Sequence, residues 1–203
     1  YVYQKNNVRF DDKKLMTPVL ANCSRFSIDY RGNSMFVGGG NGGGYGVSVK
    51  DDYSHEIVAA LLNSRLLEWV VQKTSSQFKG NSYSYGKQYI EGLPVETGEH
   101  TNQIESLTED IVSLIEDSRE DKKDEITALE NLIDFLVYEM YFDEKFDDSL
   151  LRAVTEATSG LSDPEEKAKK VRNSSYIEEI ITDMKEDEWI EIVDSDKLRD
   201  KSW

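Results

Sequence analysis

Cysteine, histidine and proline are scarce in this chain, and each scarcity removes a class of chemistry. Cys23 is the only cysteine, so no disulfide can form within the chain, and we expect a cytoplasmic location. We expect its side chain to be small, apolar and buried. The only histidines, His55 and His100, have no companions at metal-ligand spacing. We expect His55 to be exposed in the first turn of a helix and His100 to lie in a linker.

Several catalytic motifs are also missing. The three prolines are far apart, which excludes the Asn/Asp-Pro-Pro-aromatic loop with which amino-methyltransferases hold a flipped base. No Gly-x-x-x-x-Gly-Lys-Ser/Thr segment exists, so a P-loop is excluded. No apolar run approaches the roughly 20 residues of a membrane span, and no signal peptide is visible. We therefore predict no catalytic residue, no metal ligand and no membrane contact.

Charge is divided unevenly along the chain, whose formal net charge is −16. Residues 1–95 hold 11 lysines and arginines and 8 acidic residues, whereas residues 96–203 hold 13 and 32. Because an acidic surface repels phosphates, any contact with nucleic acid is expected in the first half. We predict that carboxylates such as those of Glu105, Glu109 and Glu116 lie on solvated helix faces.

The first 50 residues have the pattern of short strands. Pro18–Ala21, Arg25–Tyr30 and Ser34–Val37 are apolar or alternating runs, and Arg31–Asn33 between the last two predicts a hairpin turn. Gly38, Gly40 and Gly43 satisfy Gly-x-Gly-x-x-Gly. A dinucleotide site needs a helix after this motif, but the β-favouring run Val47–Val49 follows. We therefore predict a glycine-rich loop between strands.

The rest of the chain has mainly helical periodicity. Apolar residues at three- and four-residue steps predict one amphipathic helix over Ser54–Gln72, with Ser54 as its N-cap. Asn63 and Ser64 are expected to lie against the sheet, and Leu66, Leu67 and Trp69 in the core. Phe78–Val95 is predicted to be a polar, aromatic loop with an apolar end.

After a predicted linker at Glu96–Asn102, two apolar stripes predict an antiparallel helical hairpin. The stripes run over residues 104–115 and 126–141. In the tail, Asp163 before Pro164 predicts a helix start, and Trp189–Val193 a short strand.

We accordingly predict an α+β fold, with a curved antiparallel β region and a packed amphipathic helix, followed by the helical hairpin and a mostly helical tail. The predicted parts are residues 1–95, 96–146 and 147–203. Since the chain opens at Tyr1, we expect it to be a piece of a longer protein.

A basic, amide-rich and aromatic cluster lies in the net-positive half. Lysines neutralise phosphates, while asparagine and glutamine can form paired hydrogen bonds with base edges, adenine above all. The alternative is an exposed loop whose tyrosines pack on the sheet. The candidate DNA contacts are Lys73, Lys79, Asn81, Tyr83, Tyr85, Lys87 and Gln88, with Arg31, Asn33 and Asn41 as weaker candidates.

Several segments taken in order resemble a known family. They are Pro18–Ala21, Arg25–Asp29, the Leu-Leu-Asn-Ser-Arg-Leu-Leu run at Leu61–Leu67, Phe78–Gly80, and the Lys-Gln-Tyr-Ile…Leu-Pro-Val close at Lys87–Val95. This series resembles the TaqI-like C-terminal specificity domain of N6-adenine DNA methyltransferases, particularly in type IIG restriction–modification enzymes. A weaker resemblance, to the helical segment after such domains, runs through Leu129–Tyr141.

The resemblance implies a non-catalytic target-recognition domain that reads double-stranded DNA while another domain of the same protein flips adenine. S-adenosylmethionine and Mg²⁺ would belong to the methyltransferase domain, and to a nuclease domain where the parent protein also cleaves DNA. This chain departs from the family in its acidic second half and its long glycine run. A different hypothesis is that the chain is a protein-interaction module, which assembles a complex through the helical hairpin, along its Leu107–Leu114 seam.

Overall fold

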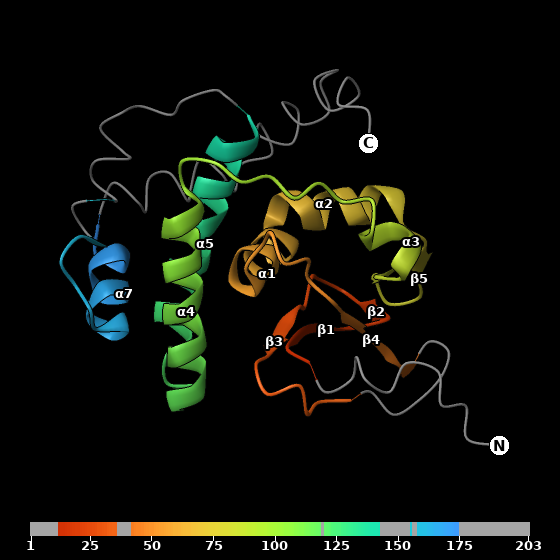
Figure 1. Ribbon diagram of the computed structural model, residues 1–203, viewed down its shortest axis with the longest axis horizontal. Coiled ribbons are helices and arrows are strands. Elements are labelled where there is room, and N and C mark those ends of the chain that lie inside the picture. Colours follow the sequence, from red (N-terminus) through yellow and green to blue (C-terminus); the bar gives the residue numbers. More distant parts are fainter. Residues whose placement is uncertain (1–11, 36–41, 119, 143–154, 156–157, 175–203) are drawn as a thin grey trace. The chain divides into compact units, whose positions relative to one another are not determined.

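The structure is a computed structural model that describes residues 12–35, 42–118, 120–142, 155 and 158–174 (Figure 1). Its contacts divide the chain into two compact units. Unit 1 comprises residues 1–97 and 101–108, and unit 2 comprises residues 98–100 and 109–203. Two small antiparallel sheets and six described helices confirm the predicted α+β class. No helix in the described ranges has the length and apolar character needed to cross a membrane.

Unit 1 contains both sheets. The first has the strand order β3 (Ser27–Asp29), β1 (Lys14–Pro18), β4 (Gly44–Val47). The second has the order β2 (Leu20–Ala21), β6 (Ser82–Ser84), β5 (Gln77–Phe78). Only Val19 separates β1 from β2, so one bent strand takes part in both sheets.

Val19 joins the two sheets through its backbone. Its N–H donates to the Gly43 carbonyl at 3.0 Å, and its carbonyl accepts from the Tyr85 N–H at 2.8 Å. In an antiparallel ladder the N–H and C=O of one residue face the same neighbour. The segments around β4 and β6 therefore meet along one edge of the bent strand, which gives the β region its curvature.

The strand predicted at Arg25–Tyr30 is shorter than expected, because a side chain takes the backbone groups of Phe26. The Phe26 N–H donates to Asn63 Oδ1, and Asn63 Nδ2 donates to the Phe26 carbonyl, both at 2.8 Å. A residue whose two backbone groups bond to an amide cannot extend the ladder, so β3 begins at Ser27. The expected placement of Asn63 against the β region is confirmed.

The predicted turn after this strand forms, but a paired return strand does not follow it directly. Gly32 has a φ of +65°, and its N–H bonds weakly to the Asp29 carbonyl at 3.4 Å. The Ser34 N–H then donates to Asp29 Oδ2 at 2.8 Å, and residues 33–35 are irregular. The remainder of the strand predicted at Ser34–Val37 lies outside the described residues.

The strand predicted at Val47–Val49 lies earlier in the chain, as β4, and shares only Val47 with the prediction. Gly46 pairs with Met16, and a Cβ at Gly46 would lie 3.2 Å from Lys14 Cδ. The end of the glycine run therefore lies in a strand, and the absence of a side chain at Gly46 leaves room for Lys14.

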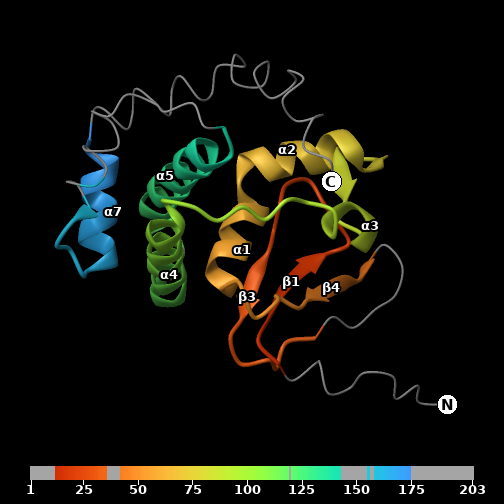
Figure 2. The ribbon, with the colours of Figure 1, turned by 45° about the horizontal axis from the view of Figure 1, so that its top comes forward.

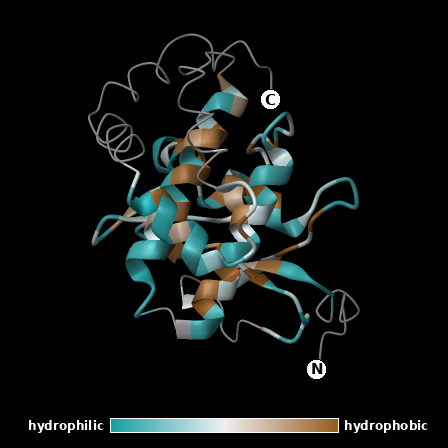
Figure 3. Cartoon of the chain, turned by 90° about the vertical axis from the view of Figure 1, so that its left-hand side faces the viewer, coloured by the Kyte–Doolittle hydropathy of each residue, from teal (hydrophilic) through white to brown (hydrophobic). Residues whose placement is uncertain are grey.

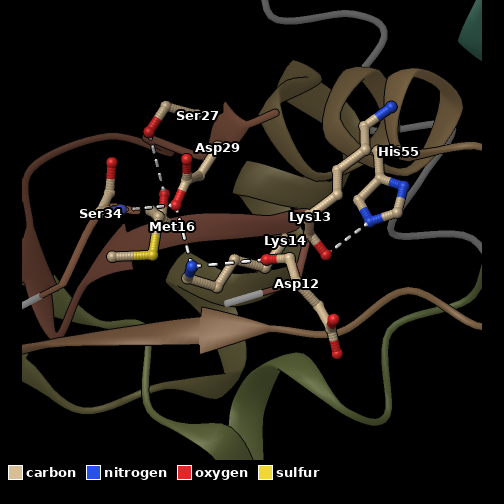
Figure 4. A network of polar contacts seen from close by, with 8 residues as sticks. All are labelled: Asp12, Lys13, Lys14, Met16, Ser27, Asp29, Ser34 and His55. Carbon is tan, nitrogen blue, oxygen red and sulfur yellow. Dashed lines mark hydrogen bonds and ion pairs between the residues drawn. The ribbon is translucent and has the colours of Figure 1, made fainter. Parts of the chain in front are cut away.

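Lys14 and Asp29 form a buried ion pair between facing positions of β1 and β3 (Figure 4). Lys14 Nζ lies 2.8 Å from Asp29 Oδ2, and the two side chains are 5% and 4% exposed. The hydrogen bond from Lys14 lowers the pKa of Asp29 from 3.8 to about 2. A buried charge without its partner is costly, so this pair fixes the register of β1 against β3.

Two helices replace the single helix predicted at Ser54–Gln72. They are α1 (His55–Asn63) and α2 (Arg65–Thr74), and Ser64 between them is extended. The Ser64 hydroxyl donates to the Leu61 carbonyl at 2.6 Å and accepts from the Leu67 N–H at 3.3 Å. It thus ends one helix and caps the next. The apolar residues of both helices lie in the same core. They therefore keep recurring at three- and four-residue steps across Ser64, and the sequence pattern does not show where one helix ends and the next begins.

The predicted N-cap and most of the predicted core of this region are confirmed. Ser54 Oγ accepts from the Ile57 N–H at 3.1 Å. Leu66 and Leu67 are each 1% exposed, whereas Trp69 is only half-buried. Helix α1 is buried along nearly its whole length and lies beside β1 and β3 (Figures 1 and 2).

The predicted helices of the second half form. They are α4 (Thr101–Ser118), which begins in unit 1, α5 (Lys123–Tyr141) and α7 (Pro164–Arg172). Both apolar stripes are largely buried, and hydrophobic and hydrophilic residues alternate along the helices (Figure 3). The Asp163 carboxylate caps α7, with Pro164 at the first position, as predicted. The strand predicted at Trp189–Val193 lies outside the described residues.

Three predictions about polar side chains were wrong. His55 is half-buried rather than exposed, and its Nε2 lies 3.1 Å from the Lys13 carbonyl oxygen. His100 lies in the linker before α4, as predicted; it is buried there, with its Nε2 3.0 Å from Glu139 Oε2. Cys23 is only half-buried, and its sulfur accepts from Arg25 Nε at 3.4 Å. Asp110 is among several buried carboxylates, although acidic side chains were all expected on solvated faces. Glu109 and Glu116 are exposed as predicted, while Glu105 is half-buried.

Replacing Asp29 with asparagine is expected to destabilise unit 1 by about 3–5 kcal/mol, because Lys14 keeps its charge in a buried position. Urea unfolding at pH 7 measures this loss. Asp52→Asn, at an exposed turn residue, is the matched control and should unfold as the wild type does. Equal losses in the two variants would contradict the argument.

The same pair predicts a pH dependence. Because the pKa of Asp29 is lowered, its ionised form stabilises the fold above the ordinary value of 3.8, and this contribution is lost as the pH falls towards about 2. The difference in unfolding free energy between wild type and Asp29→Asn should therefore shrink between pH 4 and pH 2, as sampled by urea titrations about one pH unit apart. A constant difference over that range would contradict the assignment.

Candidate nucleic-acid interface

The segment predicted as a loop at Phe78–Val95 is mostly a hairpin followed by a short helix. Strands β5 and β6 pair at Gln77↔Tyr83 and Phe78↔Ser82, and α3 spans Lys87–Ile90. β6 also pairs with β2, at Ala21↔Tyr83. The hairpin is thus the outer part of the second sheet and is held there by backbone hydrogen bonds.

The hairpin reverses at Lys79–Asn81 in a conformation that few residue types adopt. Gly80 has a φ of +80° and Asn81 a φ of +54°, and Asn81 is the only non-glycine residue with positive φ among those described. Glycine and asparagine tolerate this region best. The Gly-Asn pair is a known hairpin signal, which the sequence analysis did not use.

Exposed basic and amide side chains gather around this turn. The end of α2, the hairpin and α3 lie together in both ribbon views (Figures 1 and 2). Between Glu68 and Glu91 the chain holds three lysines and no acidic residue. Six of the exposed side chains of this region are together called the hairpin surface; they are Lys73, Phe78, Lys79, Asn81, Lys87 and Gln88.

Two of these lysines have neighbours that leave their charge accessible. Lys73 Nζ lies 5.5 Å from the centre of the Trp69 ring. Lys87 Nζ lies 3.4 Å from Glu91 Oε2, but the two side chains are 79% and 61% exposed. An ion pair this exposed is weak, so a phosphate could replace the carboxylate at little cost.

Two tyrosines flank the hairpin surface and are half-buried. Tyr83 lies on β6. In α3, the Tyr89 hydroxyl lies 3.0 Å from Ser76 Oγ, and hydrogen bonds from Ser76 and Gln88 lower its pKa. These contacts hold the Tyr89 ring against the start of β5.

The prediction that Tyr85 contacts DNA conflicts with its position in the core. Tyr85 is 0% exposed, and its ring meets that of Phe26 edge-on, with 6.0 Å between centres. Its hydroxyl accepts from Ser24 Oγ at 3.4 Å, and burial raises its pKa to about 12. Tyr85 directly follows β6, and its N–H bonds to the Val19 carbonyl at 2.8 Å, so a segment taken for an exposed loop is held against the bent strand.

The weaker candidates are not brought to the hairpin surface. Arg31 and Asn33 are exposed in the turn after β3, beside the start of β1, where Asp29 pairs with Lys14. The hairpin instead pairs with the last residues of the bent strand, roughly 20 Å further along it. Asn41 lies outside the described residues.

Phe78 is an exposed aromatic residue that the sequence analysis did not select. It is 40% exposed at the end of β5, next to Lys79 at the turn. Exposed phenylalanine in nucleic-acid-binding proteins can contact the thymine methyl group. Recognition of the Gly-Asn turn would have placed Phe78 on a strand and drawn attention to it.

Nothing in the described ranges forms a metal centre, since no group of three histidine, cysteine, aspartate or glutamate side chains is arranged to hold an ion. The carboxylate of Glu68, whose pKa is raised by burial, accepts from the Ser24 N–H at 3.0 Å and from Gln72 Nε2 at 2.8 Å. The Glu68 carboxylate thus connects α2 to the loop after β2.

No protein-family model matches the chain, and no curated protein matches it either.

The left-handed turn predicts different responses from two glycines. Gly80→Ala should destabilise the protein by about 1–2 kcal/mol, because alanine at positive φ is strained. Gly92→Ala is the control, since a Cβ at either glycine meets nothing within 4 Å and only Gly80 has positive φ. Thermal denaturation of the two variants measures the difference. Equal melting temperatures would contradict the turn geometry.

Proposed function

We propose that unit 1 recognises a specific sequence in double-stranded DNA and contacts the duplex through the hairpin surface. The observation that carries the proposal is the acid-free, lysine-bearing hairpin in a chain of net charge −16. In so acidic a protein, a segment with three lysines and no acidic residue favours an anionic ligand, and the Glu91 carboxylate just beyond it pairs with Lys87 only at an exposed position. The resemblance to TaqI-like specificity domains supports the same conclusion.

The shape of the hairpin suits a base-reading role. A two-stranded ribbon fits the major groove, where each base pair presents a distinct pattern of donors and acceptors. Asn81 at the turn and Gln88 on α3 have exposed amides that can bond to adenine. Lys73, Lys79 and Lys87 would neutralise phosphates and set the register of the hairpin on the duplex.

Catalysis is assigned to other domains of a larger protein. By the resemblance, those domains would bind S-adenosylmethionine and Mg²⁺, transfer a methyl group to adenine and, where the parent is also a nuclease, cleave DNA. The rival role, assembly along the Leu107–Leu114 seam, has less support, because Leu107 and Leu114 are 1% and 2% exposed and so are already covered.

Fluorescence anisotropy with mixed-sequence duplex DNA, at increasing salt, tests the proposal. Lys79→Ala and Lys87→Ala should each weaken binding and reduce the slope of log affinity against log salt by about 0.9, the value for one phosphate contact. Lys50→Ala is the control, because Lys50 is exposed beyond the opposite end of β4. Identical affinities and slopes in all three variants would overturn the assignment of the hairpin surface.

A further inference from the structure

Among the described helices of unit 2, α7 is basic and the others are acidic. Helix α4 has five acidic residues and no lysine or arginine, and α5 has five acidic residues and one lysine. Helix α7 reverses the balance, with four basic and two acidic residues among its nine. It packs against α5 (Figures 1 and 2).

Charged contacts connect α7 to the second half of α4 and the start of α5. Lys167 forms an ion pair with Asp110, and the two side chains are only 9% and 12% exposed. Arg172 lies 2.9 Å from Asp124 and 3.6 Å from Glu125. The buried pair requires a cation at the position of Lys167 in the docked helix. The pairs of Arg172 favour a cation at its position more weakly, because Arg172 is 50% exposed.

The apolar part of the contact is small. Ala168 and Val171 are each 0% exposed, and they are the only buried apolar side chains of α7. With Lys167 and Arg172 they occupy positions i, i+1, i+4 and i+5, which share one face of a helix. Lys169 and Lys170 are exposed.

Helix α7 is too short to be stable by itself. Its nine residues fall below the roughly 12–15 that an isolated helix needs in water, so its helical form depends on docking. A helix held by charge and by two small apolar side chains can be replaced by another helix of the same pattern.

We propose that the face formed by the second half of α4 and the start of α5 is a docking site for a basic amphipathic helix, and that α7 occupies this site within the chain. The partner is a helix with a lysine or arginine at each end of a small apolar pair, in the spacing of residues 167–172. Such a partner displaces α7. This inference is independent of the DNA-reading role of unit 1.

The test uses a fluorescent peptide with the sequence of residues 161–174 and the full chain. Attachment to the same chain gives α7 a high local concentration, so the peptide should bind the wild type weakly. Lys167→Asp in the chain should strengthen peptide binding about tenfold or more, because it removes the tethered competitor. Lys170→Asp is the matched control, with the same charge change at an exposed position, and should bind as the wild type does.

A charge exchange tests the specificity of the site. The peptide carrying Lys167→Asp should bind the chain carrying Asp110→Lys and not the wild-type chain. Equal binding to the chains carrying Lys167→Asp and Lys170→Asp would overturn the proposal, because it would show attraction to overall charge only.

Hydrogen exchange on the wild-type chain keeps the test independent of variant folding. Excess peptide should accelerate exchange of the α7 amides and leave those of α1 unchanged. Unchanged exchange in α7 at a peptide concentration that saturates binding would also overturn the proposal.

Discussion

The bent strand from Lys14 to Ala21 is the part on which the rest of unit 1 depends. Its first half lies between β3 and β4, its last two residues pair with β6, and Val19 bonds to the segments around both β4 and β6. The hairpin is therefore positioned by main-chain hydrogen bonds rather than by its exposed side chains. A scaffold of this kind permits an exposed side chain such as Lys79 to change without moving the surface that carries it, which suits the proposed recognition role.

Two buried ion pairs contribute specificity more than stability. Replacing a buried pair by apolar residues is often neutral, whereas leaving one partner alone is costly. The pair of Lys14 with Asp29 thus penalises a shifted register of β1 against β3, since a one-residue slip would turn a charge to the wrong face. The pair of Lys167 with Asp110 does the same for α7, because it selects the helix that carries a lysine at that position.

The sequence was sufficient for the fold class and for most helices, because apolar periodicity reports directly on burial. It failed where a side chain ended an element by capturing backbone groups. Ser64 divides a helix without interrupting its apolar period, and Asn63 shortens a strand that lies far from it in sequence. The lysines chosen as candidate DNA contacts are exposed, whereas Tyr85 is buried, because composition cannot distinguish an exposed loop from a segment held against the bent strand by backbone hydrogen bonds.

The uneven distribution of charge makes the two proposed contacts compatible in one protein. If both proposals hold, the acidic helices of unit 2 would repel DNA, and the lysines of the hairpin surface would repel a basic helix. Each proposed ligand would then be directed to one unit by the charge that excludes the other. The buried lysine of α7 adds a requirement that long-range attraction cannot supply, since only a helix with a cation at the position of Lys167 satisfies the Asp110 carboxylate. On these proposals, charge would select the class of partner for each unit, and the buried pair would select the individual helix within that class.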